Sequence, residues 1–138
     1  MVKIYLAHPG VPSVMRTAKK LQKQLEDLGF QVFNPFDSTL QAMGLKREWD
    51  GNPDKINTET CYKIFDHDLS NVTNSDILIA YVPKVFTAGT MMEIYHAFMQ
   101  GKLIYIYSSI RSPWLIVPSG DKVYSDFNKI LEALKKYV

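Results

Sequence analysis

The chain has 138 residues, enough for one hydrophobic core and too few for two separate domains. Hydrophobic residues make up 46% of it and charged residues 22%, the proportions of an ordinary soluble globular protein. The net charge is +2 and the Lys and Arg residues are scattered along the chain, which argues against a nucleic acid polymer as partner. We therefore expect one domain over residues 1–138.

The cysteine content and the N-terminus indicate where the protein works. The single cysteine, Cys61, excludes an intramolecular disulfide and a cysteine-based metal cluster, and it suits a reducing cytoplasm. The apolar run at residues 2–7 is too short for a signal peptide. No stretch approaches the roughly 20 apolar residues that cross a bilayer. We expect a cytoplasmic protein that does not contact a membrane.

Apolar periodicity predicts strands that alternate with helices. Short apolar runs bounded by Gly, Pro or Asn predict strands, and apolar residues three and four positions apart predict helices. The expected strands are residues 2–7, 30–33, 77–82, 103–107 and 115–118, and the expected helices are 14–28, 58–72, 90–100 and 127–134. The segment 36–57 has no periodicity, and we expect a functional loop or lid there, with a short helix near Leu40–Met43.

This alternation predicts the fold class. Apolar strands separated by helices indicate an α/β protein with a parallel sheet of about five strands, doubly wound into a three-layer, flavodoxin/Rossmann-like sandwich. Ligands bind such sheets at the carboxyl ends of the strands. We therefore expect residues 7–10, 34–37 and 83–90 to surround one crevice.

Glu93 is the first candidate for chemistry, because Thr90-Met91-Met92-Glu93 opens a helix after the most apolar strand. One interpretation is a capping box, in which the Glu93 side chain bonds back to the amide of Thr90. The other is a carboxylate at the crevice that the helix N-terminus keeps ionised, so that it can attack an anomeric carbon. The sequence alone leaves both open.

Two further side chains lie where the same crevice is expected. Asp68 falls on the inward stripe of its helix, either as a hydrogen-bonded polar residue at the rim or as a group that binds and protonates a leaving nucleobase. Tyr5 lies in the first strand, either as a core tyrosine or as a hydroxyl that holds Glu93 in place. Both alternatives remain for each residue.

Phosphate, metal and redox chemistry have weaker signals. Gly89 and Thr90, with Thr87 before them, resemble part of a phosphate-binding turn at a helix N-terminus. We expect no metal, because His8 and His96 have no third partner at metal-ligand spacing. We also expect no cofactor, because residues 8–12, which follow the first strand, are a poor candidate for the loop rich in Ser, Thr and Gly that a redox cofactor would need.

Taken together, these segments resemble the nucleoside 2-deoxyribosyltransferase family. That pattern runs from Asp-Leu through a polar stretch, an apolar strand and a loop to Gly-x-x-x-Glu and a helix that ends in Gly-Lys. The matching segments here are residues 68–72, 75–80, 89–94 and 101–102, and Ile4-Tyr5-Leu6-Ala7 fits the opening strand.

The resemblance implies a role for each candidate. Glu93 corresponds to the nucleophile that forms a 2-deoxyribosyl-enzyme ester, Asp68 to the carboxylate at the base-binding end, and Tyr5 to the hydroxyl that orients the nucleophile. The implied partners are a nucleoside or nucleotide and a nucleobase. The implied assembly is a homodimer or larger homo-oligomer with active sites shared between subunits.

Position 87 departs from the pattern of the transferases that use free nucleosides. Those enzymes carry Asp six residues before the nucleophile, whereas relatives that hydrolyse nucleoside 5′-monophosphates carry a hydroxyl residue there. This chain has Thr87, which favours a 5′-monophosphate, with His8 or Arg16 as counter-charge for the phosphate. Arg16 equally fits a solvated helix residue.

Four functions remain for comparison. The chain is expected to be a deoxyribosyltransferase that passes the sugar to another base, with an N-glycosidase that uses water as the alternative. A nucleotide-binding module without catalysis would be expected to lack Glu93 or Asp68, and both are present. A flavodoxin-like redox protein is disfavoured by the loop His8-Pro9-Gly10-Val11-Pro12.

Overall fold

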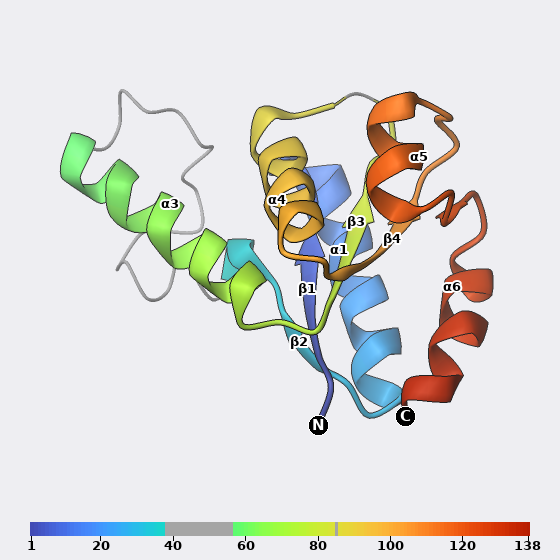
Figure 1. The fold of residues 1–138 in the computed structure, drawn as a ribbon. Coiled ribbons are helices and arrows are strands. Elements are labelled where there is room, and N and C mark those ends of the chain that lie inside the picture. Colours follow the sequence, from blue (N-terminus) through green and yellow to red (C-terminus); the bar gives the residue numbers. More distant parts are fainter. Residues whose placement is uncertain (38–56, 85) are drawn as a thin grey trace.

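The computed structural model describes residues 1–37, 57–84 and 86–138 and contains a five-stranded sheet (Figure 1). The sheet order is β2-β1-β3-β4-β5, and every neighbouring pair is parallel. The strands are β1 (Lys3–Ala7), β2 (Gln31–Phe33), β3 (Ile77–Tyr81), β4 (Leu103–Tyr107) and β5 (Val123–Tyr124). The predicted α/β class with a parallel sheet of about five strands is confirmed.

Helices cover both faces of the sheet. On one face, α1 (Pro12–Asp27) and α6 (Phe127–Leu134) share a core with Ile4 and Leu6 of β1. On the other, α3 (Thr58–Thr73), α4 (Ala88–Met99) and α5 (Pro113–Ser119) lie over a core that contains Tyr5 and Ala7. A 3₁₀ turn, η2 (Lys135–Tyr137), follows α6. The alternation of side chains along β1 divides it between the two cores.

The direction in which successive strands are added to the sheet changes at β1, although all strands stay parallel. The connection through α1 leads from β1 to β2 at the edge, and the connection through α3 returns to β3 on the other side of β1. Because right-handed crossovers in opposite directions place their helices on opposite faces, the carboxyl ends of β1 and β3 flank an opening. The residues that follow these two strands therefore lie at the expected ligand-binding edge.

The prediction of a strand at residues 115–118 is wrong. These residues belong to α5, and the fifth strand is Val123–Tyr124. The Ser112 side chain accepts a hydrogen bond from the backbone N–H of Trp114, and Pro113 occupies the first helical turn. Gly120, at φ 61°, ends the helix. The apolar run 115–118 is compatible with a strand or a helix, and the residues that begin and end α5 favour the helix.

The helix α3 packs against the core only at its C-terminal end. The predicted apolar stripe is only partly buried: Val72 is enclosed, whereas Phe65 is 47% exposed. Figure 1 shows the first turns of α3 projecting away from the sheet. The helix expected near Leu40–Met43 lies outside the described residues.

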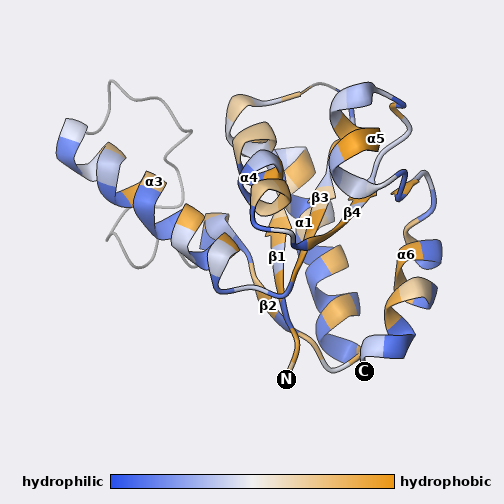
Figure 2. Cartoon of the chain, in the orientation of Figure 1, coloured by the Kyte–Doolittle hydropathy of each residue, from blue (hydrophilic) through white to orange (hydrophobic). Residues whose placement is uncertain are grey.

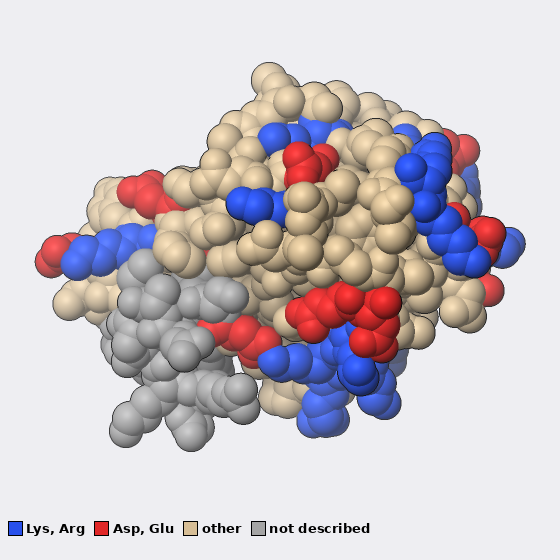
Figure 3. Space-filling view, turned by 90° about the horizontal axis from the view of Figure 1, so that it is seen from below, with Lys and Arg blue, Asp and Glu red and all other residues tan. Residues whose placement is uncertain are grey.

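The outward surfaces of the helices differ in polarity (Figure 2). The outward face of α1 carries Lys, Gln, Glu and Asp side chains, the usual pattern of a helix that covers a sheet. Seen from the end at which the strands begin, the surface intersperses both charge signs (Figure 3). In the described part of the chain, no helix is long and apolar enough to cross a membrane.

A buried serine joins the ends of β3 and β4. The Ser108 hydroxyl donates to the backbone carbonyl of Val82 at 2.6 Å and accepts from the backbone N–H of Ile110 at 3.0 Å. Ser108 is 4% exposed, whereas the next residue, Ser109, is exposed. Removal of the Ser108 hydroxyl would leave two backbone groups without this partner.

We predict that Ser108→Ala lowers the free energy of unfolding by about 1–3 kcal/mol, because it removes the partner of two buried polar groups. Ser109→Ala is the matched control and should change that free energy by less than about 0.5 kcal/mol. Urea denaturation followed by circular dichroism measures both. Equal effects of the two substitutions would contradict the structural role of Ser108.

Candidate active site

A tyrosine hydroxyl and a glutamate carboxylate meet beneath α4. Tyr5 lies in the middle of β1, and Glu93 is the sixth residue of α4. The Tyr5 hydroxyl donates a hydrogen bond to Oε2 of Glu93. Tyr5 is fully buried and Glu93 is 8% exposed, so the pair lies between the sheet and the helix. The bond joins residues 88 positions apart in the sequence.

The burial of this pair changes the acidity of both groups. Burial raises the pKa of Glu93 from 4.5 to about 8; the bond from Tyr5 opposes this shift, and the negative charge of Asp68 adds to it. Burial also raises the pKa of Tyr5 well above its ordinary value, with further contributions from Glu93 and Asp68. The tyrosine therefore stays protonated and donates the bond.

Asp68 completes a cluster of three groups. It is half-buried on α3, and its charge is close enough to raise the pKa of both Tyr5 and Glu93. The neighbouring Asp66 is exposed. Three elements, β1, α3 and α4, thus contribute one side chain each to the cluster predicted from the sequence.

Two aromatic rings support the cluster from the side of β2. The Phe33 ring stacks on the Tyr5 ring with centroids 5.3 Å apart and an interplanar angle of 24°. The centroid of the His67 ring lies 5.8 Å from that of the Phe33 ring, at an interplanar angle of 45°. His67 is half-buried within α3. The Phe33 ring thus contacts the Tyr5 ring, and the His67 ring contacts the Phe33 ring.

The N-terminus of α4 differs from the predicted capping box. The helix begins at Ala88, with Thr87 as its N-cap, so Thr90 lies inside the first turn. The Thr87 hydroxyl donates to the Thr90 hydroxyl at 2.9 Å. Because Glu93 bonds to Tyr5 instead, the capping interpretation is wrong. The expectation that the helix N-terminus keeps Glu93 ionised is also wrong, since burial raises the pKa of Glu93 to about 8. Gly89 is exposed, and a Cβ there would meet no atom within 4 Å.

His8 and Arg16 lie in a separate cleft on the α1 side of the sheet. This cleft of about 290 Å³ is lined by both residues and by others from α1 and the segment after β2. The His8 ring is 2% exposed, and its Nε2 lies 2.9 Å from Oδ1 of Asn34. Burial lowers the pKa of His8. Arg16 is exposed.

The structure thus divides the candidate residues into groups. Tyr5, Asp68 and Glu93 come together, and Thr87, Gly89 and Thr90 form the N-terminal turn of the helix that carries Glu93. His8 meets Asn34 and Phe36 as expected for neighbouring strand ends, but the 83–90 segment does not line their cleft. In the described part of the chain, no group of three or more His, Cys, Asp or Glu side chains is placed to hold a metal ion.

Sequence reasoning missed Phe33 and Asn34. Phe33 pairs with Tyr5 in the parallel register of β1 and β2, so both side chains leave the sheet on the same face. The apolar run 30–33 indicated a strand. The pairing of Phe33 with Tyr5, however, depends on the register between β1 and β2, which the length and placement of α1 set. Asn34 holds both the His8 ring and the backbone N–H of Phe36 through Oδ1.

Comparison with known families decides the identity of the fold. The sequence profile of the family described as nucleoside 2-deoxyribosyltransferase matches residues 4–134. The chain belongs to this family. No curated protein matches the chain significantly.

Solved structures of nucleoside 2-deoxyribosyltransferases are similar to the chain along most of its length. A 2-deoxyribosyltransferase of the psychrotolerant bacterium Bacillus psychrosaccharolyticus is 23% identical, has a TM-score of 0.71, and the match covers 94% of this chain and 90% of that one. The 2-deoxyribosyltransferase of Leishmania mexicana is 14% identical, with a TM-score of 0.68 and coverage of 99% and 98%.

A third similar structure is the CMP N-glycosidase of Clostridium botulinum. It is 22% identical to this chain, with a TM-score of 0.56, and the match covers 96% of this chain and 97% of that one. These similarities establish the shared fold. Family membership supports a glycosyl-transferring or glycosidase enzyme that acts on nucleosides.

We predict that stability depends on pH through Glu93. Between pH 4.5 and about 8, the folded protein keeps a proton on Glu93 that the unfolded chain has lost. Stability should therefore fall as pH rises through this window, by up to about 1.4 kcal/mol per pH unit from this residue. Glu93→Gln removes the titration, so the variant should gain stability relative to the wild type as pH rises.

Urea denaturation at a series of pH values measures this difference. Glu26→Gln is the control, because Glu26 is exposed on α1. Its stability should run parallel to that of the wild type at every pH. A Glu93→Gln curve that also runs parallel to the wild type would show that burial does not hold the proton on Glu93.

Proposed function

We propose that the chain cleaves the N-glycosidic bond of a 2′-deoxynucleoside or its 5′-monophosphate and passes the 2-deoxyribosyl group to another nucleobase. The observation that carries this proposal is the buried hydrogen bond from Tyr5 to Glu93 beside the charge of Asp68. A carboxylate held by a hydroxyl, next to a second carboxyl group, is the arrangement with which retaining glycosidases break a glycosidic bond.

In the first step, an oxygen of the ionised form of Glu93 attacks C1′ of the deoxyribose. Because the pKa of Glu93 is about 8, this form becomes more abundant as the pH rises toward 8. The bond between C1′ and the base nitrogen breaks, and its electron pair leaves with the base. The transition state carries positive charge at C1′, which the Glu93 carboxylate offsets as the ester forms. Asp68 binds the departing base and supplies a proton to it, so that the base leaves as a neutral molecule.

In the second step, the ring nitrogen of an incoming base attacks C1′ and displaces Glu93. The carboxylate is regenerated, and the proton of the incoming nitrogen passes to Asp68. Tyr5 keeps its proton throughout, because its pKa lies far above neutrality, and it donates to Glu93 whenever that group is ionised. Its role is to fix the position of the carboxylate.

Substrate preference depends on the turn before α4. We propose that Thr87 accommodates a 5′-phosphate, which an aspartate at that position would repel. Gly89 and Thr90 belong to the same turn, where a helix N-terminus favours anions. His8 and Arg16 line a separate cleft on the α1 side, and we propose that the charge of Arg16, or of His8 when it is protonated, balances the phosphate charge.

Hydrolysis is the second candidate reaction. The hydroxyl at Thr87 and the similarity to a CMP N-glycosidase both favour it, since water in place of a second base would release free base and deoxyribose 5-phosphate. The first step is the same in both reactions. The two differ only in the acceptor that displaces Glu93.

Two expectations accompany this activity. The free thiol of Cys61 favours a cytoplasmic location, where nucleotide salvage takes place. The family resemblance favours a homodimer or larger homo-oligomer with active sites shared between subunits.

The activity is tested by a chromatographic time course with deoxynucleosides and their 5′-monophosphates, each with and without a second free base. A product that carries the added base supports transfer, and free base with a deoxyribose product supports hydrolysis. Glu93→Gln is the control that should abolish either reaction. Absence of reaction with every substrate, or turnover that survives Glu93→Gln, would overturn the proposal.

We predict that Tyr5→Phe lowers kcat about 10- to 100-fold, the cost of one hydrogen bond to a charged group. The bond from Tyr5 lowers the pKa of Glu93, so its loss should move the acid limb of the pH–rate profile to higher pH. Tyr81→Phe, on the opposite face of the sheet, is the matched control. An acid limb that stays in place in Tyr5→Phe would argue that Tyr5 does not act on the nucleophile.

Asp68→Asn should lower turnover about 100-fold or more, because the amide no longer supplies a proton to the leaving base. Asp66→Asn provides the control, since Asp66 lies two residues away on the exposed side of the same helix. Steady-state kinetics with one deoxynucleoside compare the two variants. Comparable rates in both would reduce Asp68 to a structural residue.

Thr87→Asp should shift preference from 5′-monophosphates to free nucleosides, with the ratio of their kcat/KM values falling about tenfold or more. The reason is repulsion between the new carboxylate and the phosphate. Thr87→Ser keeps the hydroxyl and should retain the original ratio. If the ratio is the same in all three proteins, position 87 does not face the phosphate.

A further inference from the structure

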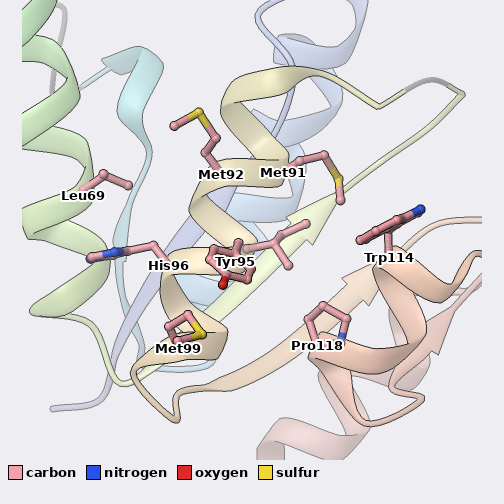
Figure 4. Close-up of a pocket in the computed structure, with 9 residues that line it drawn as sticks. Leu69, Met91, Met92, Tyr95, His96, Met99, Trp114 and Pro118 are labelled. Atoms are coloured by element: carbon pink, nitrogen blue, oxygen red, sulfur yellow. The ribbon is translucent and has the colours of Figure 1, made fainter.

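The clefts on the two sides of the sheet differ in chemistry. The groove of about 440 Å³ between α3, α4 and α5 is lined mainly by aliphatic, methionine and aromatic side chains (Figure 4). The cleft on the α1 side, where β1 and β2 end, is lined by several ionisable side chains: His8, Arg16, Lys19 and Asp37. His8 is 2% exposed, and buried polar atoms are normally hydrogen-bonded. The atoms around the His8 ring therefore decide which protonation state fits.

Both ring nitrogens of His8 face oxygen atoms. Nδ1 lies 2.9 Å from the backbone carbonyl oxygen of Pro9, and Nε2 lies 2.9 Å from Oδ1 of Asn34. Carbonyl and amide oxygens accept hydrogen bonds and cannot donate them. A neutral imidazole has one N–H and can donate to only one of these oxygens, whereas an imidazolium has two and can donate to both. Both bonds therefore form only when the ring is protonated.

Two other contacts fix the orientation of the Asn34 amide. The backbone N–H of Phe36 donates to Oδ1 of Asn34 at 3.1 Å, and Nδ2 of Asn34 donates to Oε1 of Gln22 on α1 at 3.2 Å. If the amide were rotated by half a turn, Nδ2 would face the backbone N–H of Phe36, donor against donor. Asn34 therefore presents an oxygen to His8 and does not donate to a neutral ring.

Phe36 connects the His8 ring to the wall of the cleft. The centroids of the two rings lie 5.0 Å apart, and a Cβ on Gly10, in the loop after β1, would lie 2.6 Å from the Phe36 ring. The next residue, Asp37, forms an ion pair with Lys19 of α1. The segment after β2 is thus attached to β1 through the His8 ring and to α1 through Lys19.

The surroundings of His8 act on its pKa in opposite directions. Burial has the largest effect and lowers the pKa, because it disfavours the charged ring. The bonds to Pro9 and Asn34 and the negative charge of Asp37 raise it. The net direction is downward, so the ring takes its second proton below its ordinary value of 6.5.

The other ionisable groups near His8 come from α1 and β3. Arg16 and Lys19 line the same cleft, and Lys19 is paired with Asp37. Tyr81 of β3 lies on the same face of the sheet. Histidine is the side chain whose ordinary pKa lies closest to neutral pH. A change of pH in that range therefore acts on the cleft through His8.

We propose that His8 is a proton-controlled clamp at the carboxyl edge of the sheet. With two ring protons, it bonds the Pro9 carbonyl and Asn34 at once and holds the segment that carries Phe36 against the loop after β1. With one ring proton, it loses one of these bonds, and this wall of the cleft is held less tightly. His8 is a positioning residue that acts through Asn34 and Phe36, because its buried ring has no nitrogen left to bind a ligand.

A pH titration by NMR tests the clamp without substrate, so its outcome is separate from that of the proposed reaction. In a ¹⁵N-labelled chain, ring-nitrogen shifts show how many protons His8 carries. The amide shifts of Gly10 and Phe36 report the bonds to Pro9 and Asn34. Between about pH 4 and 8, His8 should change from two ring protons to one, with a midpoint below 6.5. The Gly10 or the Phe36 amide should shift with the same midpoint.

Three variants complete the test. Asn34→Asp places a carboxylate against Nε2 and should raise the midpoint of His8 by about 1–3 pH units. Asn128→Asp adds the same charge at an exposed position of α6 and should leave that midpoint unchanged. His8→Gln does not titrate, so the matching shift of the Gly10 or Phe36 amide should disappear. Because the chain has three histidines, this variant also assigns the ring signals of His8.

The wild-type titration alone can overturn the proposal, even if a variant fails to fold. A His8 ring that keeps one proton on the same nitrogen throughout this pH range would do so. A titration of His8 that moves neither the Gly10 nor the Phe36 amide would also overturn it, as would a folded Asn34→Asp variant with the wild-type midpoint.

Discussion

The bond between Tyr5 and Glu93 is the constraint around which the rest of the site is arranged. A carboxyl group that faces a sheet beneath a helix pays a desolvation cost, seen in the rise of the Glu93 pKa to about 8. The Tyr5 hydroxyl is the donor that offsets part of this cost. The bond joins a strand to a helix, so the packing of β1 against α4 and the geometry of the site are coupled.

The parallel sheet provides the rigidity that this bond needs. The side chain of Tyr5 leaves the middle of β1, between β2 and β3, so neighbouring strands fix the strand on both sides. Phe33 then stacks on its ring in register. The cluster consequently lies on the face of the sheet under α4, while Thr87 and the turn that begins α4 lie at the carboxyl edge.

Local patterns predicted the fold and indicated Tyr5, Asp68 and Glu93 as candidates, because both depend on short-range information. The apolar run at 77–82 predicted a strand followed by the helix that carries Glu93. The position of Asp68 on the inward stripe of its helix made it a candidate site residue. The prediction of a capping box was wrong because Thr87 rather than Thr90 caps the helix. Apolar periodicity does not place a helix start to within three residues. The strand predicted at 115–118 failed because four apolar residues fit either structure, and Ser112, Pro113 and Gly120 decided it. Phe33 and the cleft around His8 depend on strand register and on contacts between distant segments.

The proposed covalent step can be observed directly as a change in protein mass. We would mix the wild type with a 2′-deoxynucleoside, quench with acid within the first turnovers, and map the modified peptide by mass spectrometry. We predict a 2-deoxyribosyl ester on Glu93 that disappears when an acceptor base is added and never forms in Glu93→Gln. Turnover without any adduct, or an adduct on another residue, would contradict it.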